Sequence, residues 1–361
     1  MKFGIVNRSR GTLFPYQGWP TVCKDENGVL YVTCSGHRLG HICPFGKNLM
    51  YISHDEGETW SSPIIINDTE LDDRDSGILS LGDGKLLMTY FNHTREFYFS
   101  YRDWILRNTD PSTNDMTNGI LECWKNMSDE QNHNGSFLRL SQNGGLTWDA
   151  PIRVPVTSPH GPIKLKNGKL LYLGKEKESY KYESGAIYAF TSDDSGKSWE
   201  CLSKLTNPDG VDNNLLHEPY AVELPNGRLI GVIRAHGTAV KECGFGILRC
   251  FSDDGGLTWT IPEDLGICGS PPHLLLHSSG ALILTYARRH APYGERARIS
   301  YDGGVTFGEE IVIGEYTSDG DLGYPSTVEL SDGSLLTVYY QKYKNDPYCS
   351  ILSTKWRIDE A

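Results

Sequence analysis

The sequence has little basic charge, no long apolar run and no paired-cysteine motif. Its 361 residues include 34 Lys and Arg against 46 Asp and Glu, which gives a net charge of −12. So acidic a chain lacks the broad attraction that binds nucleic acid or an anionic membrane. No stretch approaches the roughly twenty apolar residues that a membrane helix needs. We therefore expect neither a nucleic-acid partner nor a membrane partner.

The nine cysteines are scattered and include no Cys-x-x-Cys pair. The sequence therefore predicts neither a metal site nor a disulfide framework. The first residues, "MKFGIVNRSRGTLF", lack the basic end, the apolar segment and the small-residue cleavage site of a signal peptide. These observations favour a reduced, cytoplasmic protein. No cofactor is expected, and the oligomeric state is not indicated.

Glycine is abundant, at 39 residues, and part of it belongs to a motif that occurs five times. The motif reads Ser-x-Asp/Asn-x-Gly-x-Thr/Ser-aromatic. Its short acidic or amide side chain can hydrogen-bond the amides of its own turn, and glycine supplies the positive φ that closes the turn. The copies are "SHDEGETW" at 53, "SQNGGLTW" at 141, "SDDSGKSW" at 192, "SDDGGLTW" at 252 and "SYDGGVTF" at 300. We expect these corners to be structural.

A second repeat, of two apolar segments around a turn, alternates with the first and predicts six β-hairpins. Its copies begin at 21, 77, 161, 220, 273 and 326, and "YAVELPNGRLIGVI" is typical. A hairpin plus two strands joined at the corner makes a four-stranded blade. The sequence thus predicts an all-β, six-bladed propeller of four-stranded antiparallel blades. We expect one domain over 1–361, no long helix, an insertion at about 95–135 in blade 2, and a closing strand from "KFGIVNRS".

Polar and aromatic residues gather where a propeller would bring them together, at one mouth of its channel. Inner strands begin at this mouth and second strands end there. The segments before the inner strands include "GWP" at 18, "DDRDSG" at 72, "PHGP" at 159, "HEP" at 217, "PPH" at 271 and "LGYP" at 322. The segments after the second strands include "SGHRLGH" at 35, "NHTRE" at 92, "GKEKE" at 174, "IRAH" at 233 and "ARRH" at 287. This convergence predicts a binding site.

Three segments resemble the sialidase superfamily of six-bladed propellers. "EPYAVELPNGRLIGVIR" is similar to the family segment whose glutamate polarises a tyrosine nucleophile and whose arginine closes the strand. "GYPSTVELSDGSLLTVYY" is similar to the family segment that carries the tyrosine nucleophile. The resemblance implies Tyr324 as nucleophile, Glu218 as its partner and Arg234 as a carboxylate ligand. It also implies a further carboxylate-binding arginine in "GERARISYDGG", for which we take Arg296, with Arg298 as the alternative.

The residue types suit that chemistry. Most glycosidases use two carboxylates, whereas sialidase-like enzymes use a tyrosine as nucleophile. A neutral phenol does not repel an acidic sugar, and a nearby glutamate can accept its proton. Arginine binds carboxylates with two parallel hydrogen bonds.

Two positions depart from the family pattern. The family opens its first blade with an Arg-Ile-Pro type motif, and the matching stretch here, "GWP", has no arginine. The family also keeps an acid/base aspartate in the loop after the next strand, but no Asp or Glu lies between Arg38 and Asp55. His41 from that loop, or Asp73 or Asp75 from blade 2, can serve instead. These departures favour a terminal sugar other than ordinary sialic acid.

The leading hypothesis is a sialidase-like exo-glycosidase that hydrolyses a terminal sugar, expected to be acidic, from an oligosaccharide or glycoconjugate. The alternatives are a His/Tyr lyase acting on a uronate and a non-catalytic glycan-binding propeller. The predicted catalytic residues are Tyr324, Glu218, His41 and Asp75. The predicted substrate-binding residues are Trp19, Arg38, Arg74, His160, His217, Arg234, His273, Arg288 and Arg296. Each histidine can instead be structural, and Trp19 can be either a sugar platform or a channel plug. Five arginines of the rim can simply pair with rim carboxylates: those at 38, 74, 95, 288 and 289.

Overall fold

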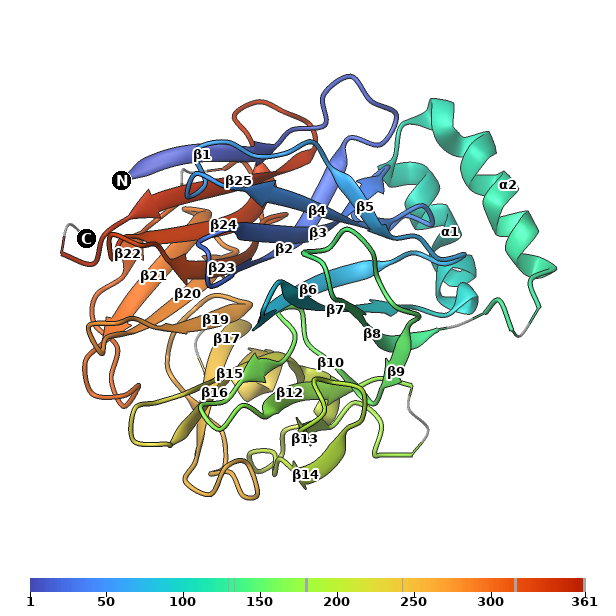
Figure 1. Cartoon of the computed structure of the whole chain (residues 1–361). Helices are drawn as coiled ribbons and strands as arrows, with labels where there is room; N and C mark the ends of the chain where they lie inside the picture. The colour runs from blue at the N-terminus through green and yellow to red at the C-terminus, as the bar shows by residue number, and fades with distance from the viewer. Residues whose placement is uncertain (129, 133, 179–180, 242, 315–316, 360–361) are drawn as a thin grey trace.

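Six antiparallel sheets surround a central axis, and each sheet forms one blade (Figure 1). The computed structural model describes residues 1–128, 130–132, 134–178, 181–241, 243–314 and 317–359. From the axis outwards, blade 1 contains β2 (Tyr16–Lys24), β3 (Leu30–Arg38), β4 (Lys47–Ser53) and β5 (Ile64–Asn67). Blade 2 contains β6 (Arg74–Gly82), β7 (Lys85–Asn92), β8 (Gly135–Ser141) and β9 (Ile152–Val154). Blade 3 begins with β10 (Val156–Thr157) and β11 (Ile163–Lys164), which are followed by β12 (Leu170–Glu176), β13 (Ile187–Ser192) and β14 (Glu200–Lys204).

Blades 4 to 6 repeat the same order, and short 3₁₀ turns flank blade 4. Blade 4 contains β15 (Leu216–Glu223), β16 (Leu229–His236), β17 (Phe245–Ser252) and β18 (Glu263–Asp264). Blade 5 contains β19 (Pro272–Leu276), β20 (Leu282–Arg288), β21 (Gly294–Ser300) and β22 (Ile311–Val312). Blade 6 contains β23 (Gly323–Glu329), β24 (Leu335–Lys342), β25 (Cys349–Trp356) and β1 (Lys2–Asn7). The turns are η2 (Asn213–Leu215) and η3 (Gly237–Ala239). The predicted six-bladed propeller of four-stranded antiparallel blades is confirmed, although the inner strand of blade 3 is split.

The ring closes through the two ends of the chain. Strand β1 is the outermost strand of blade 6 and pairs antiparallel with β25, so the first and last strands lie side by side (Figure 1). The segment "KFGIVNRS" supplies this strand, as the sequence predicts. Blade 6 has no repeated corner because its outer strand comes from the other end of the chain.

The repeated corners join the third and fourth strands of blades 1 to 5, on the face opposite the mouth. In blade 2, the Gly145 amide donates to Ser141 Oγ and the Thr147 amide to Asn143 Oδ1, both at 2.9 Å. Gly145 has a φ of 82°, and a Cβ atom there would lie 2.6 Å from the Met50 side chain of blade 1. Glycine is therefore required both by the backbone conformation and by contact with the preceding blade.

The contact with the preceding blade recurs around the ring. A Cβ atom at Gly196 would lie 2.8 Å from Leu87 of blade 2, and one at Gly304 would lie 2.2 Å from Ile230 of blade 4. Each corner thus docks on its neighbour as well as closing its own blade. The corners are therefore structural, as the sequence predicts.

The insertion after β7 is helical, which corrects the expectation that the chain contains no long helix. It consists of α1 (Arg95–Asn108), η1 (Pro111–Thr113) and α2 (Asn114–Lys125). Thr94 caps α1 by accepting from the Phe97 amide at 3.2 Å. The helices form their own apolar cluster, and Tyr98 Oη donates to Asp72 at 2.6 Å, which anchors them to blade 2. Among the described residues, no helix is long and apolar enough to cross a membrane.

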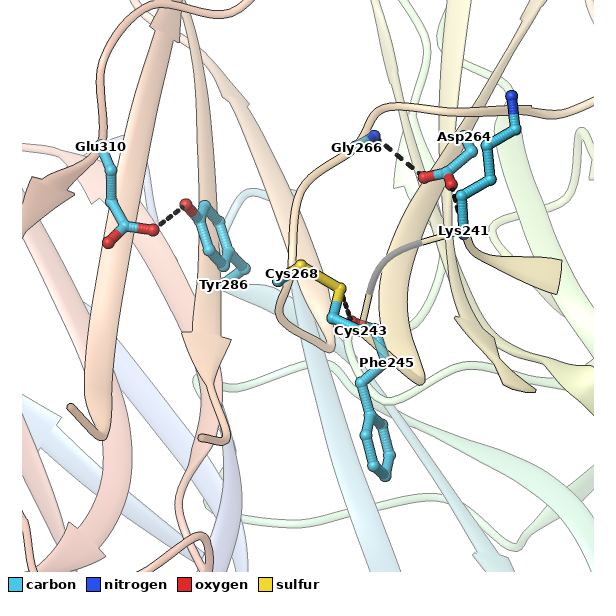
Figure 2. The surroundings of a disulfide bond; sticks show 8 residues. All are labelled: Lys241, Cys243, Phe245, Asp264, Gly266, Cys268, Tyr286 and Glu310. Carbon is cyan, nitrogen blue, oxygen red and sulfur yellow. Dashed lines mark hydrogen bonds between the residues drawn. A yellow bond between two sulfur atoms is a disulfide. The ribbon is translucent and has the colours of Figure 1, made fainter. Parts of the chain in front are cut away.

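A disulfide joins Cys243 to Cys268 (Figure 2), which corrects the prediction that the cysteines form no disulfide. Cys243 lies just before β17 and Cys268 between β18 and β19, so the bond ties blade 4 to the start of blade 5. The two residues are 25 positions apart in sequence, but their Cα atoms lie only 5.7 Å apart. Their pairing follows from how two loops meet, which cysteine spacing does not indicate.

Candidate active site at the propeller mouth

Four of the six inner strands begin with a bulge that holds one residue in the left-handed region. The φ angles are 58° at Trp19, 42° at Asp75, 48° at Glu218 and 53° at Tyr324, and the strand register shifts around each residue. Such backbone is costly for residues other than glycine, on the order of 1 kcal/mol or more each. In three of the four segments a proline follows, and it fits a bulge because it needs no ladder hydrogen bond. Strain at equivalent positions of four blades marks a built site.

The structure brings Tyr324, Glu218 and Arg234 into direct contact. Tyr324 Oη donates a short hydrogen bond to Glu218 Oε1. Arg234 Nη1 donates to Glu218 Oε2 at 2.8 Å and lies 3.4 Å from Tyr324 Oη. Burial alone would raise the pKa of Glu218, but the charge of Arg234 and the two hydrogen bonds hold it at about 2. Burial and the charge of Glu218 raise the pKa of Tyr324 well above 10, so the phenol is neutral at rest.

Arg289 is the second arginine beside the tyrosine. It follows β20, and its guanidinium carbon lies 5.8 Å from the centre of the Tyr324 ring. Its Nε donates to the Ser270 carbonyl at 3.0 Å, while its buried Nη2 has no hydrogen-bond partner among the described residues. An unpartnered, buried cationic donor is costly unless a ligand completes it. In the sequence this residue stands out only as part of "ARRH", at the end of a second strand.

Arg296, which the resemblance suggests as a carboxylate ligand, does not join this cluster. It lies on β21, a third strand, and is only 1% exposed. Its guanidinium donates to Glu310 Oε1 at 3.1 Å and to the Pro292 carbonyl at 2.9 Å. Arg288 donates to the same Glu310 oxygen at 3.0 Å. Arg296 lies on a third strand, farther from the axis, and Arg288 at the end of the second strand shares its Glu310 partner, so these two arginines form a rim network rather than a part of the Tyr324 cluster.

Arg38, Arg74 and Trp19 form a buried group on the blade 1 side of the mouth. Arg38 is fully buried, and its Nη2 donates to Asp72 Oδ2 at 2.9 Å. Arg74 Nη1 lies 3.4 Å from the same oxygen, while Arg74 Nε has no partner among the described residues. The Arg74 and Arg38 guanidinium carbons lie 4.4 and 4.9 Å from the centre of the Trp19 ring. Trp19 is 2% exposed, which favours its role as a channel plug over that of a sugar platform.

His41 forms a pair with Asp321 that the sequence does not reveal. His41 Nδ1 lies 3.0 Å from Asp321 Oδ1 and 3.0 Å from Tyr16 Oη, and its ring meets Trp19 edge-on. Burial lowers the pKa of His41 below its usual value, although Asp321 opposes the shift. The pair lines an open cavity of about 440 Å³, whose walls include Trp104 of α1, Tyr348 and Arg289. The helical insertion thus forms one wall of the mouth.

Asp75 faces a smaller cavity on the side of blades 2 to 4. This cavity of about 210 Å³ is also lined by Glu218, His217, Lys175 and Lys177. Burial raises the pKa of Asp75 to about 7, while Arg74 partly offsets the shift. Its Oδ1 atom is buried without a hydrogen-bond partner among the described residues. Neighbouring Asp73 is instead held by hydrogen bonds from Asn92 and Thr69.

The remaining predicted histidines divide between this cavity and the axial channel. His217 Nε2 lies 2.7 Å from the Asn214 carbonyl, so one edge of its ring is occupied. His160 and His273 lie 4.9 Å apart, ring centre to ring centre, and line a channel cavity of about 280 Å³. Burial lowers the pKa of His160 to about 4. Neither channel histidine contacts the Tyr324 hydroxyl. Among the described residues, no group of His, Cys, Asp or Glu side chains is arranged to hold a metal ion.

Solved structures share this architecture at low sequence identity. A protein of unknown function from Dyadobacter fermentans is 22% identical, with a TM-score of 0.78 over 99% of this chain and 98% of that one. The NanB sialidase from Streptococcus pneumoniae is 14% identical, with a TM-score of 0.71 over 99% of this chain and 71% of that one. The Trypanosoma rangeli sialidase is 17% identical, with a TM-score of 0.59 over 94% and 55%. These similarities show a sialidase-like propeller fold.

Comparison with models of protein families assigns the chain to a family. A comparison with curated proteins finds no match. The BNR/Asp-box repeat matches residues 51–62, which include the first corner. The BNR repeat-like domain matches residues 114–337, more than half of the 361 residues. The chain therefore belongs to the BNR repeat-like domain family.

Proposed function

We propose that this protein is a sialidase-like exo-glycosidase that releases a terminal acidic sugar from an oligosaccharide or glycoconjugate. The observation that carries the proposal is the hydrogen bond from Tyr324 to Glu218, with Arg234 in contact with both side chains. A phenol paired with a carboxylate among arginines is suited to attack on an anionic sugar. The fold shared with sialidases supports this assignment.

In the first step, Tyr324 Oη forms a bond to the anomeric carbon while the glycosidic C–O bond breaks. The phenol proton passes to Glu218 Oε1 along their hydrogen bond. Because the resting phenol is neutral, the approaching sugar carboxylate meets no opposing charge on the nucleophile. Arg234 and Arg289 then stabilise the negative charge that develops on the phenol oxygen.

The leaving group must depart towards the open side of the mouth, because it carries the rest of the glycan. The larger cavity lies on that side, and His41 faces it. His41 therefore donates the proton to the leaving oxygen, and later removes one from the water that attacks the anomeric carbon. Asp321 hydrogen-bonds the other ring nitrogen and stabilises the imidazolium. Tyr324 regains its proton from Glu218, which restores the resting enzyme. Asp75 is the less favoured acid because it faces the smaller cavity.

The carboxylate of the sugar is held by Arg234, Arg289 and Arg74. Arg74 approaches from blade 2, whereas the family's missing arginine belongs to blade 1. This geometry favours a sugar whose carboxylate is placed differently from that of ordinary sialic acid, so we expect poor hydrolysis of a simple sialoside.

A glycan panel analysed by mass spectrometry tests the proposal with two matched variants. Tyr324→Phe removes the proposed nucleophile. Tyr286→Phe removes a second buried tyrosine hydroxyl that also donates to a glutamate, Glu310, at 2.8 Å, away from the Tyr324 cluster (Figure 2). We expect the wild type and Tyr286→Phe to release a terminal acidic sugar, and Tyr324→Phe to release none. A product with a new double bond, or glycan binding without turnover by the wild type, would contradict the proposal.

A further inference from the structure

The smaller cavity beside Glu218 is lined by two lysines that have little or no ion pairing. Lys175 and Lys177 are successive inward-facing residues at the end of β12 and just beyond it, and both line the cavity. Among the described residues, no carboxylate lies within ion-pair distance of Lys175, and the nearest to Lys177 is Glu178, at 3.8 Å. A buried charge without an ion pair is expensive, so Lys175, with a second lysine beside it in the same cavity, indicates a role outside folding.

Lys175 is fixed in place by neutral groups. Its Nζ donates to the Asn213 carbonyl at 2.9 Å and to the Leu216 carbonyl at 2.7 Å, and it lies 3.3 Å from His217 Nδ1. Carbonyl oxygens orient the ammonium group without cancelling its positive charge. The lysine thus bridges blade 3 to blade 4 while its field extends into the cavity. Burial lowers its pKa to about 8, which still leaves it largely charged at pH 7.

Lys177 is held in a similar way on the opposite wall. Its Nζ lies 3.3 Å from His93 Nδ1 and 4.9 Å from the centre of the Phe91 ring. Burial lowers the pKa of His93 to about 2, so this imidazole is neutral and accepts the hydrogen bond. The side chain of Lys177 is 17% exposed, which leaves the ammonium accessible from the cavity.

The acidic side chains that line the cavity are engaged with other groups. Glu218 is already bound to Arg234 and Tyr324. Burial raises the pKa of Asp75 to about 7, so it is about half ionised at pH 7, and its unpartnered Oδ1 is available to a ligand. Glu176 accepts from the Gly185 amide at 3.0 Å. The two ammonium groups can therefore bind an anion that enters the cavity next to the proposed reaction centre.

We infer that this cavity binds a second anionic substituent, a sulfate ester or a carboxylate, carried by the same terminal sugar that Tyr324 attacks. The inference rests on the proposed function, because Glu218 lines the cavity and also contacts Tyr324. A volume of about 210 Å³ has room for such a group. Lys175 and Lys177 supply the charge, and Asp75 and His217 supply polar contacts. The substrate is thus a sugar with two negative charges, one at the arginines and one at the lysines.

The test compares the binding of three matched ligands, measured by calorimetry on the Tyr324→Phe protein so that no turnover intervenes. The ligands are methyl glycosides of a hexuronic acid that carry an O-acetyl, an O-carboxymethyl or an O-sulfate group at the same hydroxyl, with each hydroxyl tried in turn. Because a charged hydrogen bond in a desolvated site strengthens binding about tenfold or more, one anionic ligand should bind at least about tenfold tighter than its acetyl counterpart. The stronger of the two anionic ligands identifies the substituent.

Three lysine variants, made in the same Tyr324→Phe background, assign the effect to the cavity. Lys175→Gln and Lys177→Gln should each remove most of the preference for the anionic ligand. Lys166→Gln is the matched control, because Lys166 also bridges blade 3 to blade 4 through a carbonyl, that of Leu224 at 2.7 Å, on the far side of the blade. This control should keep the preference. Thermal melting verifies that each variant is folded, and Lys177→Gln tests the inference if Lys175→Gln does not fold.

Equal binding of the three ligands, failure of all of them to bind, or a preference that survives both cavity variants would overturn the inference. Its failure is distinguishable from failure of the proposed function. If the anionic preference is present but the wild type cleaves no glycoside, the hydrolytic proposal is wrong and the anion site remains. If a singly charged sugar is released efficiently and no preference is found, only the second anion is wrong.

Discussion

Replacing Arg289 with glutamine should lower kcat/KM for an acidic glycoside by one to two orders of magnitude or more. The variant keeps a polar side chain of similar reach but removes the positive charge beside Tyr324. A charged hydrogen bond to the sugar carboxylate contributes about 1.5–3 kcal/mol, which corresponds to about 10- to 150-fold in rate. The buried Nη2 of Arg289 has no partner among the described residues, so its full capacity is available to the substrate.

The position of Arg289 adds a second contribution to the same barrier. Its guanidinium carbon lies 5.8 Å from the centre of the Tyr324 ring. With an effective dielectric constant of about 20, a full negative charge at that distance is stabilised by about 3 kcal/mol. The developing charge in the transition state is only partial, so we expect a fraction of this value. Loss of Arg289 should therefore lower kcat as well as raise KM.

Arg296→Gln is the matched control, because the sequence resemblance points to Arg296 and the structure brings Arg289 to the site instead. Loss of the Arg296 bond to Glu310 should destabilise the fold by only about 1.5–3 kcal/mol, because Glu310 is 24% exposed and keeps its partner Arg288. Below its melting temperature, this variant should keep kcat/KM within about twofold, since it removes no contact to the sugar. Steady-state kinetics and thermal melting of both variants are the required assays. Full activity in Arg289→Gln, or an equal loss in folded Arg296→Gln, would refute the reasoning.

Three further predictions address the other parts of the site. Glu218→Gln should lower kcat by about 10²–10⁴-fold with little change in ligand affinity, because an amide cannot accept the phenol proton; a change in KM alone would make Glu218 a positioning residue. Because burial lowers the pKa of His41 below its usual 6.5, kcat/KM should already fall with rising pH below pH 6.5, as His41 loses its proton. His41→Asn should abolish this fall, and it should leave the hydrolysis of aryl glycosides little changed because their leaving groups need no proton. Equal losses of rate on all substrates would contradict the role of His41 as proton donor. Replacing Cys243 and Cys268 with serine should lower the free energy of unfolding by about 3 kcal/mol. Thiol titration of the unfolded wild type should detect seven of its nine cysteines. Detection of all nine would disprove the disulfide.

The sequence predicts the architecture well because the fold repeats the same local chemistry. Each corner and each hairpin turn is specified within about a dozen residues, so five or six copies reinforce one interpretation. The repeat places Tyr324 and Glu218 at the mouth, and the resemblance to sialidases then singles them out. Trp19 and Asp75 occupy equivalent positions, and the structure places all four in left-handed bulges.

What the sequence does not predict depends on contacts between blades. The choice between Arg289 and Arg296 depends on which strand of the blade each arginine occupies, and both lie in polar segments of blade 5. The contact of His41 with Asp321 joins residues 280 positions apart. The helices after β7 fold against Asp72 and one another, contacts that the repeat pattern does not indicate.

Covalent trapping tests the central claim, that Tyr324 is the nucleophile of a glycosidase, most directly. A fluorinated acidic glycosyl fluoride, matched to the sugar released in the glycan panel, slows breakdown of any glycosyl-enzyme, and peptide mass spectrometry then locates the attached sugar. We predict one adduct on the peptide that contains Tyr324 in the wild type and in Tyr286→Phe, and none in Tyr324→Phe. An adduct on another residue, such as Glu218 or Asp75, or turnover of the substrate with no trapped tyrosine, would contradict the account.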